Sequence, residues 1–249
     1  MPFCYLCGRP FADGDLKDDD HVPAKSCFAK ADRNIPLKLP THVKCNHSYH
    51  PTDEKIGQLL ALKRGATPIA RSQCLSVNVF PPSSRHGVLG AITNLDIKGA
   101  IGRWVRGFHA ALYLEPLPVS QHFGIQTPFP TASLMHGGMR LDQLPPQHSL
   151  FVKTIKVNRF ARNLDRINSN NGKLIYECIW DQSDSGPWLC IFALNIYDWK
   201  DMGATQDFPS RGCVGFYTAS TGYPPPSATR ATHLQVEIPN YDSLDPFGK

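Results

Sequence analysis

The sequence contains no long apolar run and no start of the kind that directs secretion. None of its stretches approaches the roughly 20 apolar residues of a membrane-spanning helix, and the opening MPFCYLCGRPF lacks a basic segment followed by an apolar one. No internal repeat is present either. We therefore expect a cytoplasmic protein with no membrane partner, whose eight cysteines are thiols or metal ligands rather than disulfides.

The chain also lacks a strong excess of either charge. Its 249 residues carry a formal net charge of +5 and are 41% hydrophobic, which suffices for one large domain or two smaller ones. This charge suits a polyanionic partner without requiring one, and a homo-oligomer remains open. The 22 prolines and 19 glycines indicate many turns and short elements.

Half of the cysteines lie in the first 45 residues, in a pattern that predicts a zinc site. Cys4 and Cys7 form a C-x-x-C pair, and His42 and Cys45 form an H-x-x-C pair further along. Thiolate and imidazole are the usual ligands of tetrahedral structural zinc, which stabilises small folded units. Two pairs in order are a much stronger signal than one.

An acidic run that ends in a histidine, DDDH at residues 18–21, lies between the two pairs. Runs of like charge are usually solvated, so one interpretation is an exposed turn. The other is that Asp20 holds a cation while His21 takes a proton from water, with Asp18 or Asp19 as alternative carboxylates.

Three motifs in order give the chain a resemblance to a known family. CYLCG (4–8), DHVPAKSCF (20–28) and LPTHVKCNHSYHPTDE (39–54) together resemble HNH (ββα-metal) endonucleases of the cysteine-flanked kind. The resemblance covers residues 3–60 and implies a strand–loop–strand–helix unit held by Zn²⁺, with an active site between hairpin and helix. It implies hydrolysis of phosphodiester bonds in DNA, and RNA is not excluded as a substrate.

The resemblance assigns roles to four residues around a second metal ion. Asp20 and Asn46 would bind the catalytic divalent ion, His21 would be the general base, and His50 would add a further ligand. Oxygen ligands suit Mg²⁺. An imidazole ligand from His50 would shift the preference toward Mn²⁺, Ni²⁺ or Zn²⁺.

The chain departs from the family pattern at three places, one of which is the acidic run, where Asp18 or Asp19 could supply the carboxylate in place of Asp20. His42 stands where the family more often has cysteine, and Cys27 and His47 are the alternative zinc ligands if His42 is not one. The asparagine that braces the catalytic loop in the family has only Asn34 as a candidate here.

The expected fold class is α+β, in three segments: the zinc-held HNH-like unit at 1–64, an irregular linker at 65–95, and an α+β domain at 96–249. Helices are predicted from Thr52 and within 96–114, where apolar residues recur at helical spacing. Segments 151–160, 173–181, 188–199 and 213–220 predict an antiparallel meander packed on the second helix.

Two functional questions stay open at this stage. Arg103 and Arg106 either contact a phosphate backbone or form the wet face of the second helix. The alternative to a nuclease is a non-catalytic zinc module that binds nucleic acid or protein. In a third hypothesis, residues 65–249 sense a signal that licenses the nuclease.

Overall fold

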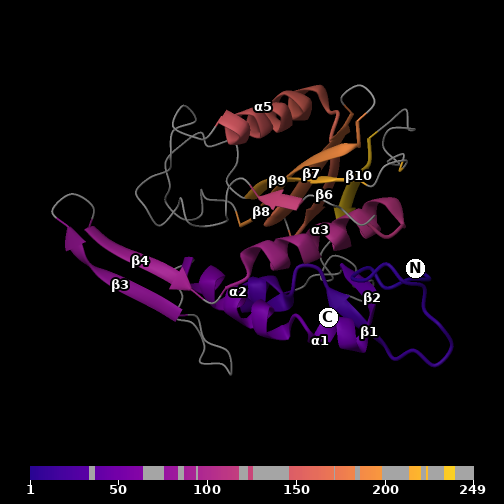
Figure 1. Cartoon of the computed structure of the whole chain (residues 1–249), viewed down its shortest axis with the longest axis horizontal. Coiled ribbons are helices and arrows are strands. Elements are labelled where there is room, and N and C mark those ends of the chain that lie inside the picture. The colour runs from indigo at the N-terminus through magenta and orange to yellow at the C-terminus, as the bar shows by residue number, and fades with distance from the viewer. Residues whose placement is uncertain are drawn as a thin grey trace, which may run out of the picture.

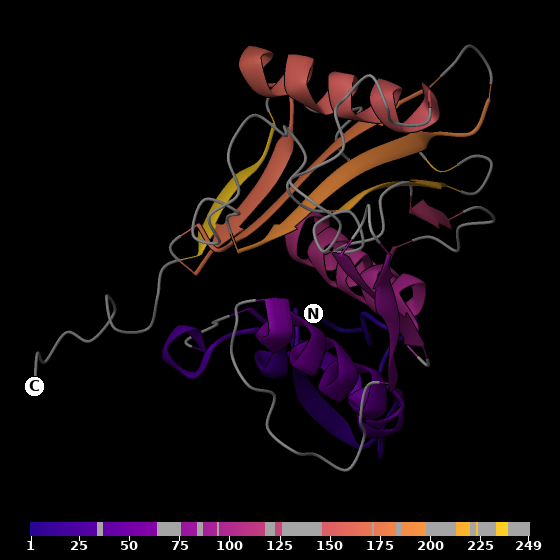
Figure 2. The same ribbon diagram turned by 90° about the vertical axis from the view of Figure 1, so that its left-hand side faces the viewer.

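The structure, a computed structural model of the chain, has a mixed α+β fold in stacked layers (Figure 1). Helix α5 covers one face of a β-sheet, α3 lies under the other face, and the N-terminal unit lies beyond α3 (Figure 2). The structure describes residues 1–33, 37–63, 76–83, 87–93, 95–117, 123–125, 146–170, 172–182, 186–197, 213–219, 223 and 233–238.

The N-terminal unit is a hairpin followed by two helices. Strand β1 (Lys17–His21) pairs antiparallel with β2 (Lys38–His42), and the 3-10 turns η1 (Lys25–Cys27) and η2 (Lys30–Asp32) lie between them. A short helix, α1 (Val43–His47), follows β2 directly, and α2 (His50–Lys63) completes the unit. Helix α2 begins two residues before the predicted Thr52.

The segment predicted to be an irregular linker contains a hairpin instead. Strands β3 (Ser76–Ser83) and β4 (Gly87–Thr93) pair antiparallel and project from the body of the molecule (Figure 1). The prolines of the first strand obscured its β pattern, because proline usually signals a loop or a strand edge.

Helix α3 (Ile97–Tyr113) was predicted correctly despite its internal glycines. The carboxylate of Asp96 caps it by accepting a hydrogen bond from Gly99 N at 2.8 Å. Gly107 permits close packing on the N-terminal unit, since a Cβ atom there would come within 2.6 Å of Val22 Cγ1. A glycine that weakens the helix is therefore what allows α3 to approach the hairpin.

The second sheet has six strands in the order β10-β6-β7-β8-β9-β5. Strands β7, β8 and β9 form the last three strands of the predicted antiparallel meander, β6 is a strand that was not predicted, and β10 pairs in parallel with β6 at the edge. The strands are β5 (Phe123–Ile125), β6 (Asp165–Ser169), β7 (Leu174–Asp181), β8 (Leu189–Ile196), β9 (Cys213–Thr218) and β10 (Gln235–Ile238).

The prediction of a strand at 151–160 was wrong, because these residues lie in helix α5 (Pro146–Ala161). Its β-branched residues favour a strand by propensity, but tertiary packing overrides propensity. Phe151 and Ile155, one helical turn apart, pack against the sheet around Ile191, while Phe160 on the outer side is 82% exposed. The sheet thus has a helix on each face rather than one helix in all.

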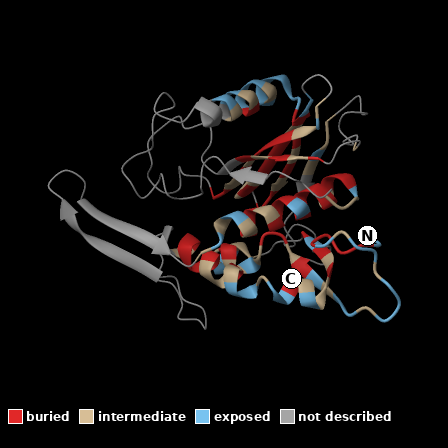
Figure 3. Cartoon of the chain, viewed as in Figure 1, coloured by how far each residue is buried: buried red, intermediate tan, exposed pale blue. Residues whose placement is uncertain are grey.

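One continuous hydrophobic core joins the N-terminal unit, α3 and the inner face of the sheet (Figure 3). Trp104 and Phe108 of α3 are buried in it, and Phe108 stacks on Tyr176 of β7 with 4.7 Å between ring centroids. The division of the chain at residues 64 and 95 stays a prediction. None of the helices in the described part of the chain is long and apolar enough to cross a membrane.

Candidate functional site

The four predicted zinc ligands come together at the end of the first hairpin. One ligand atom from each of Cys4, Cys7, His42 and Cys45 lies within 4.8 Å of the others. His42 Nδ1 is 3.5 Å from Cys7 Sγ and 4.0 Å from Cys45 Sγ. A tetrahedral ion with bonds of about 2.0–2.3 Å separates its ligand atoms by roughly 3.5–3.8 Å. The cluster could therefore bind a metal ion such as zinc.

Local backbone structure positions these ligands. The turn that carries Cys4 and Cys7 is closed by a hydrogen bond from Gly8 N to Cys4 O at 2.8 Å, with Gly8 at φ +74°. Burial raises the pKa of the Cys7 thiol, but hydrogen bonds from Arg9 outweigh it and lower this pKa to about 6. Because thiolates are the metal-binding form, Cys7 is ready to bind an ion, whereas burial and the neighbouring thiols Cys4 and Cys7 raise the pKa of Cys45 to about 11.

Asp15, which the sequence reasoning missed, holds the imidazole of His42 from outside the cluster. Asp15 Oδ2 lies 3.2 Å from His42 Nε2 and accepts a hydrogen bond from Ala12 N at 2.7 Å. A hydrogen bond between the carboxylate and Nε2 orients the imidazole ring so that its Nδ1 atom could bind a metal ion in the cluster. The Asp13-Gly14 turn just before it was the available signal, since it brings Asp15 back toward the hairpin.

The contact between Asp15 and His42 leads to a testable prediction. Asp15→Ala is expected to weaken zinc binding about 10–100-fold, because the imidazole loses the partner that orients it. The zinc affinity is measured by competition with a chelator, with the release of zinc as the readout. Asp13→Ala removes a neighbouring exposed carboxylate and is the matched control. Equal zinc affinities for the two variants would contradict a role for Asp15.

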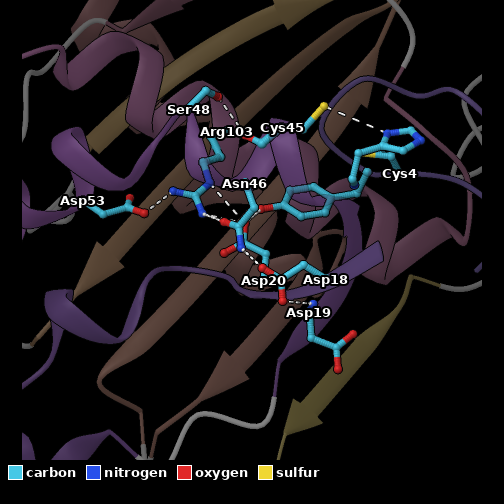
Figure 4. A network of polar contacts seen from close by, with 11 residues as sticks. Cys4, Asp18, Asp19, Asp20, Cys45, Asn46, Ser48, Asp53 and Arg103 are labelled. Carbon is cyan, nitrogen blue, oxygen red and sulfur yellow. Dashed lines mark hydrogen bonds and ion pairs between the residues drawn. The ribbon is translucent and has the colours of Figure 1, made fainter. Parts of the chain in front are cut away.

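The second group of polar residues surrounds a buried arginine. The side chain of Arg103, from α3, is only 1% exposed and forms ion pairs with Asp20 of β1 and Asp53 of α2 (Figure 4). Arg103 Nη2 lies 2.5 Å from Asp20 Oδ2 and 3.4 Å from Asn46 Oδ1. Asp20 also accepts a hydrogen bond from the Tyr5 hydroxyl. Arg103 therefore does not lie on a solvent-exposed face of the helix, and its guanidinium is not accessible to a phosphate group.

The positive charge of Arg103 only partly balances the negative charges of Asp20 and Asp53. Burial would lower the pKa of Arg103, but the surrounding acidic groups, Asp53 and Asp20 among them, raise it above its ordinary value. Burial raises the pKa of Asp53, and the charge of Arg103 only partly offsets that effect. Asp53 Oδ1 is buried with no hydrogen-bond partner among the described residues. Two carboxylates thus share one cation.

The amide of Asn46 is oriented by the two groups on either side of it. Its Nδ2 donates to Asp18 Oδ2 at 2.8 Å, so its Oδ1 faces Arg103. Asp18 and Asp20 lie on one face of β1, as expected for residues two apart in a strand. The backbone thus directs the oxygens of Asp20 and Asn46 toward the same nitrogen atom.

His21, the predicted general base, is the last residue of β1 and lies opposite Lys38 of β2. It is half-buried, and its Nε2 has no hydrogen-bond partner among the described residues. Burial, together with the charges of Lys25 and Lys38, lowers the pKa of His21. The lowered pKa favours the neutral imidazole at pH 7, with its Nε2 atom buried in this structure.

The other predicted ligands belong to neither group, although His47 lines the pocket beside His42 and Cys45, and His50 is near enough to Asp53 to act on its charge. His50 is exposed at the start of α2, with its ring 4.9 Å from that of His47. Neither histidine belongs to the Cys/His cluster that the described residues form, and Cys27 lies in the hydrophobic core. Asn34 is outside the described residues.

Comparisons with family models, with curated protein sequences and with solved structures find no match to this chain. The function is therefore inferred from the residues and their geometry.

Proposed function

We propose that the chain is a metal-dependent phosphodiesterase of the HNH type that cuts DNA. The observation that carries this proposal is the convergence of Asp20 Oδ2 and Asn46 Oδ1 on one cationic nitrogen, Nη2 of Arg103. These are the two side chains that the resemblance assigns to a divalent ion. Carboxylate and amide oxygens are ligands that Mg²⁺ accepts, with water completing its coordination.

In the proposed reaction, His21 accepts a proton from water as the oxygen attacks phosphorus, and the bond to the leaving oxygen breaks. The lowered pKa keeps His21 unprotonated at neutral pH, as a general base requires. Asp20 and Asn46 would hold the cation, and Asp18 fixes the amide of Asn46. The ion would supply charge neutralisation at the scissile phosphate and the leaving oxygen.

Basic groups beside the zinc cluster support a nucleic-acid substrate. Arg9, Lys44 and His47 line an open pocket next to Cys45 and His42. Arginine and lysine bind phosphate oxygens without reading bases, so these side chains suit positioning on a backbone. The zinc ion would keep the Cys4–Cys7 turn and α1 in place around this pocket.

A non-catalytic zinc module is the second candidate, and two observations favour it. The carboxylate of Asp20 is already paired with Arg103, as in a structural ion pair. Strand alternation also places His21 and Asp20 on opposite faces of β1. Such a module would bind nucleic acid or protein without cutting it.

Nicking of supercoiled plasmid by the purified zinc-bound chain separates the two candidates. We expect the wild type to nick DNA in about 10 mM Mg²⁺ or Mn²⁺, and Asp20→Asn to nick at least about 100-fold more slowly, because a metal ligand is lost. The same assay is repeated with Ni²⁺ as the metal and with RNA as the substrate. Asp19→Asn, which removes the neighbouring exposed charge, is expected to match the wild type within a factor of two.

Thermal unfolding of each variant must accompany this assay, since Asp20 also pairs with Arg103. Tight DNA binding by the wild type without cleavage, under every metal and on both substrates, would favour the zinc module. If the Asp20→Asn protein is folded and nicks DNA at the wild-type rate, Asp20 is not a ligand of the catalytic metal ion.

A further inference from the structure

The position of Arg103 suggests a role beyond stabilising the fold. Its guanidinium is enclosed by oxygens from three separate elements: Asp20 of β1, Asn46 of α1 and Asp53 of α2 (Figure 4). The ring of Tyr49 covers it at 4.9 Å from Cζ to centroid. All these acceptors are carboxylate or amide oxygens, which is the ligand set of a hard divalent cation.

The group around Arg103 has an unbalanced charge and, within the described part of the chain, one carboxylate oxygen without a hydrogen bond. Asp20 and Asp53 bring two negative charges and Arg103 brings one positive charge, so the buried group carries a net charge of −1. Asp53 is 8% exposed, and its Oδ1 has no hydrogen-bond partner among the described residues. A divalent ion would neutralise both carboxylates and could use this oxygen.

We propose that Arg103 is an internal competitor for a divalent cation at the oxygens of Asp20, Asn46 and Asp53. Metal then binds there only as the guanidinium withdraws. Asp53 is thereby a third metal ligand, one that the resemblance did not supply. The inference deepens the proposed function, on which it rests for any effect on cleavage, but metal competition is measurable without DNA.

The helix that carries Arg103 links this competition to the rest of the chain. Arg103 is nearly inaccessible to solvent, so its withdrawal requires α3 to shift. One turn later, Gly107 contacts Val22, the residue after His21, and the following turns pack on the six-stranded sheet. Whatever displaces the sheet relative to the hairpin therefore changes access of metal to the site.

Binding of Mn²⁺ to the zinc-loaded protein tests the proposal, with the free ion followed by electron paramagnetic resonance. The thiolate-rich zinc cluster is a poor site for Mn²⁺, which prefers oxygen ligands. We expect Arg103→Met to bind one Mn²⁺ at least 10-fold more tightly than the wild type. Mn²⁺ at about 100 times its Kd should raise the Tm of this variant by roughly 5–10 °C.

Three further variants make the result specific. Arg106→Met removes the same charge from an exposed position of α3 and should bind Mn²⁺ as the wild type does. Arg103→Lys retains a charge without the fork that spans two carboxylates, so its Mn²⁺ affinity should be intermediate. Adding Asp53→Asn to Arg103→Met should abolish the gain.

Several outcomes would overturn the proposal. A folded Arg103→Met protein with the Mn²⁺ affinity of the wild type would reduce Arg103 to a structural ion pair. So would an Arg103→Met protein that fails to fold even with Mn²⁺, together with an Arg103→Lys protein of wild-type affinity. Tight Mn²⁺ binding by the wild type that Asp53→Asn removes would show that Arg103 does not compete. None of these readings depends on DNA cleavage.

Discussion

Cys45→Ser is expected to lose its bound zinc ion and, with it, the folded structure of the N-terminal unit at residues 1–63. Structural zinc contributes about 10–16 kcal/mol of binding free energy in small zinc-dependent units, against about 5–15 kcal/mol for the stability of a whole domain. The Cys4–Cys7 turn and α1 meet at this cluster, so its loss separates the two ends of the unit.

Metal analysis and amide hydrogen exchange measure this effect. The wild type should contain one zinc per chain, and Cys45→Ser close to none, with exchange protection lost from β1, β2 and α1. Cys27→Ala is the matched control, because Cys27 is a buried cysteine of the same unit that lies outside the cluster. It should keep its zinc. Full zinc content and intact protection in a Cys45→Ser protein would refute the assignment.

Spacing along the chain was enough to predict the Cys/His cluster and the strands β7, β8 and β9. Ligand residues three positions apart lie on one turn, so the pair Cys4 and Cys7 and the pair His42 and Cys45 needed only one tertiary contact to meet. Strands β7, β8 and β9 carry long apolar runs, and strands with such runs pair with their sequence neighbours. Local patterns suffice where neighbours in sequence are neighbours in space.

Helix α5 shows where local patterns fail. Its sequence mixes β-branched, aromatic and basic residues in a way that favours a strand by propensity, and packing on the sheet makes Phe151 and Ile155 the buried side of a helix. That selection comes from residues more than 30 positions away, such as Ile191. The β3–β4 hairpin was missed for a related reason, since prolines within it mimic a linker.

The acid–arginine group was also beyond sequence reasoning, although one signal was present. Arg103 stands midway between Gly99 and Gly107 in a stripe at i, i+4 spacing, and glycines on a helix face indicate close approach by another segment. An arginine in that stripe faces protein rather than water. Its partners, Asp20 and Asp53, lie 83 and 50 residues earlier, and nothing local connects them.

His21→Ala is expected to keep its fold, its zinc and its DNA binding while the nicking rate falls about 10²–10⁴-fold, the usual contribution of a general base. The side chain forms no hydrogen bond through Nε2 among the described residues, so its removal disrupts little of the structure. Asp19→Ala, on the same face of β1, is the matched control and should retain the wild-type rate.

Rates for single and double variants distinguish a shared active site from separate defects. If Asp20 and His21 act on one phosphate, Asp20→Asn/His21→Ala should be scarcely slower than the slower single variant, because residues that act as a unit do not give additive losses. Plasmid nicking at a fixed Mg²⁺ concentration provides these rates. Equal residual cleavage by wild type and His21→Ala would mean that the cutting comes from another site or another protein. The DDDH run would then be only a strand whose buried carboxylate pairs with Arg103.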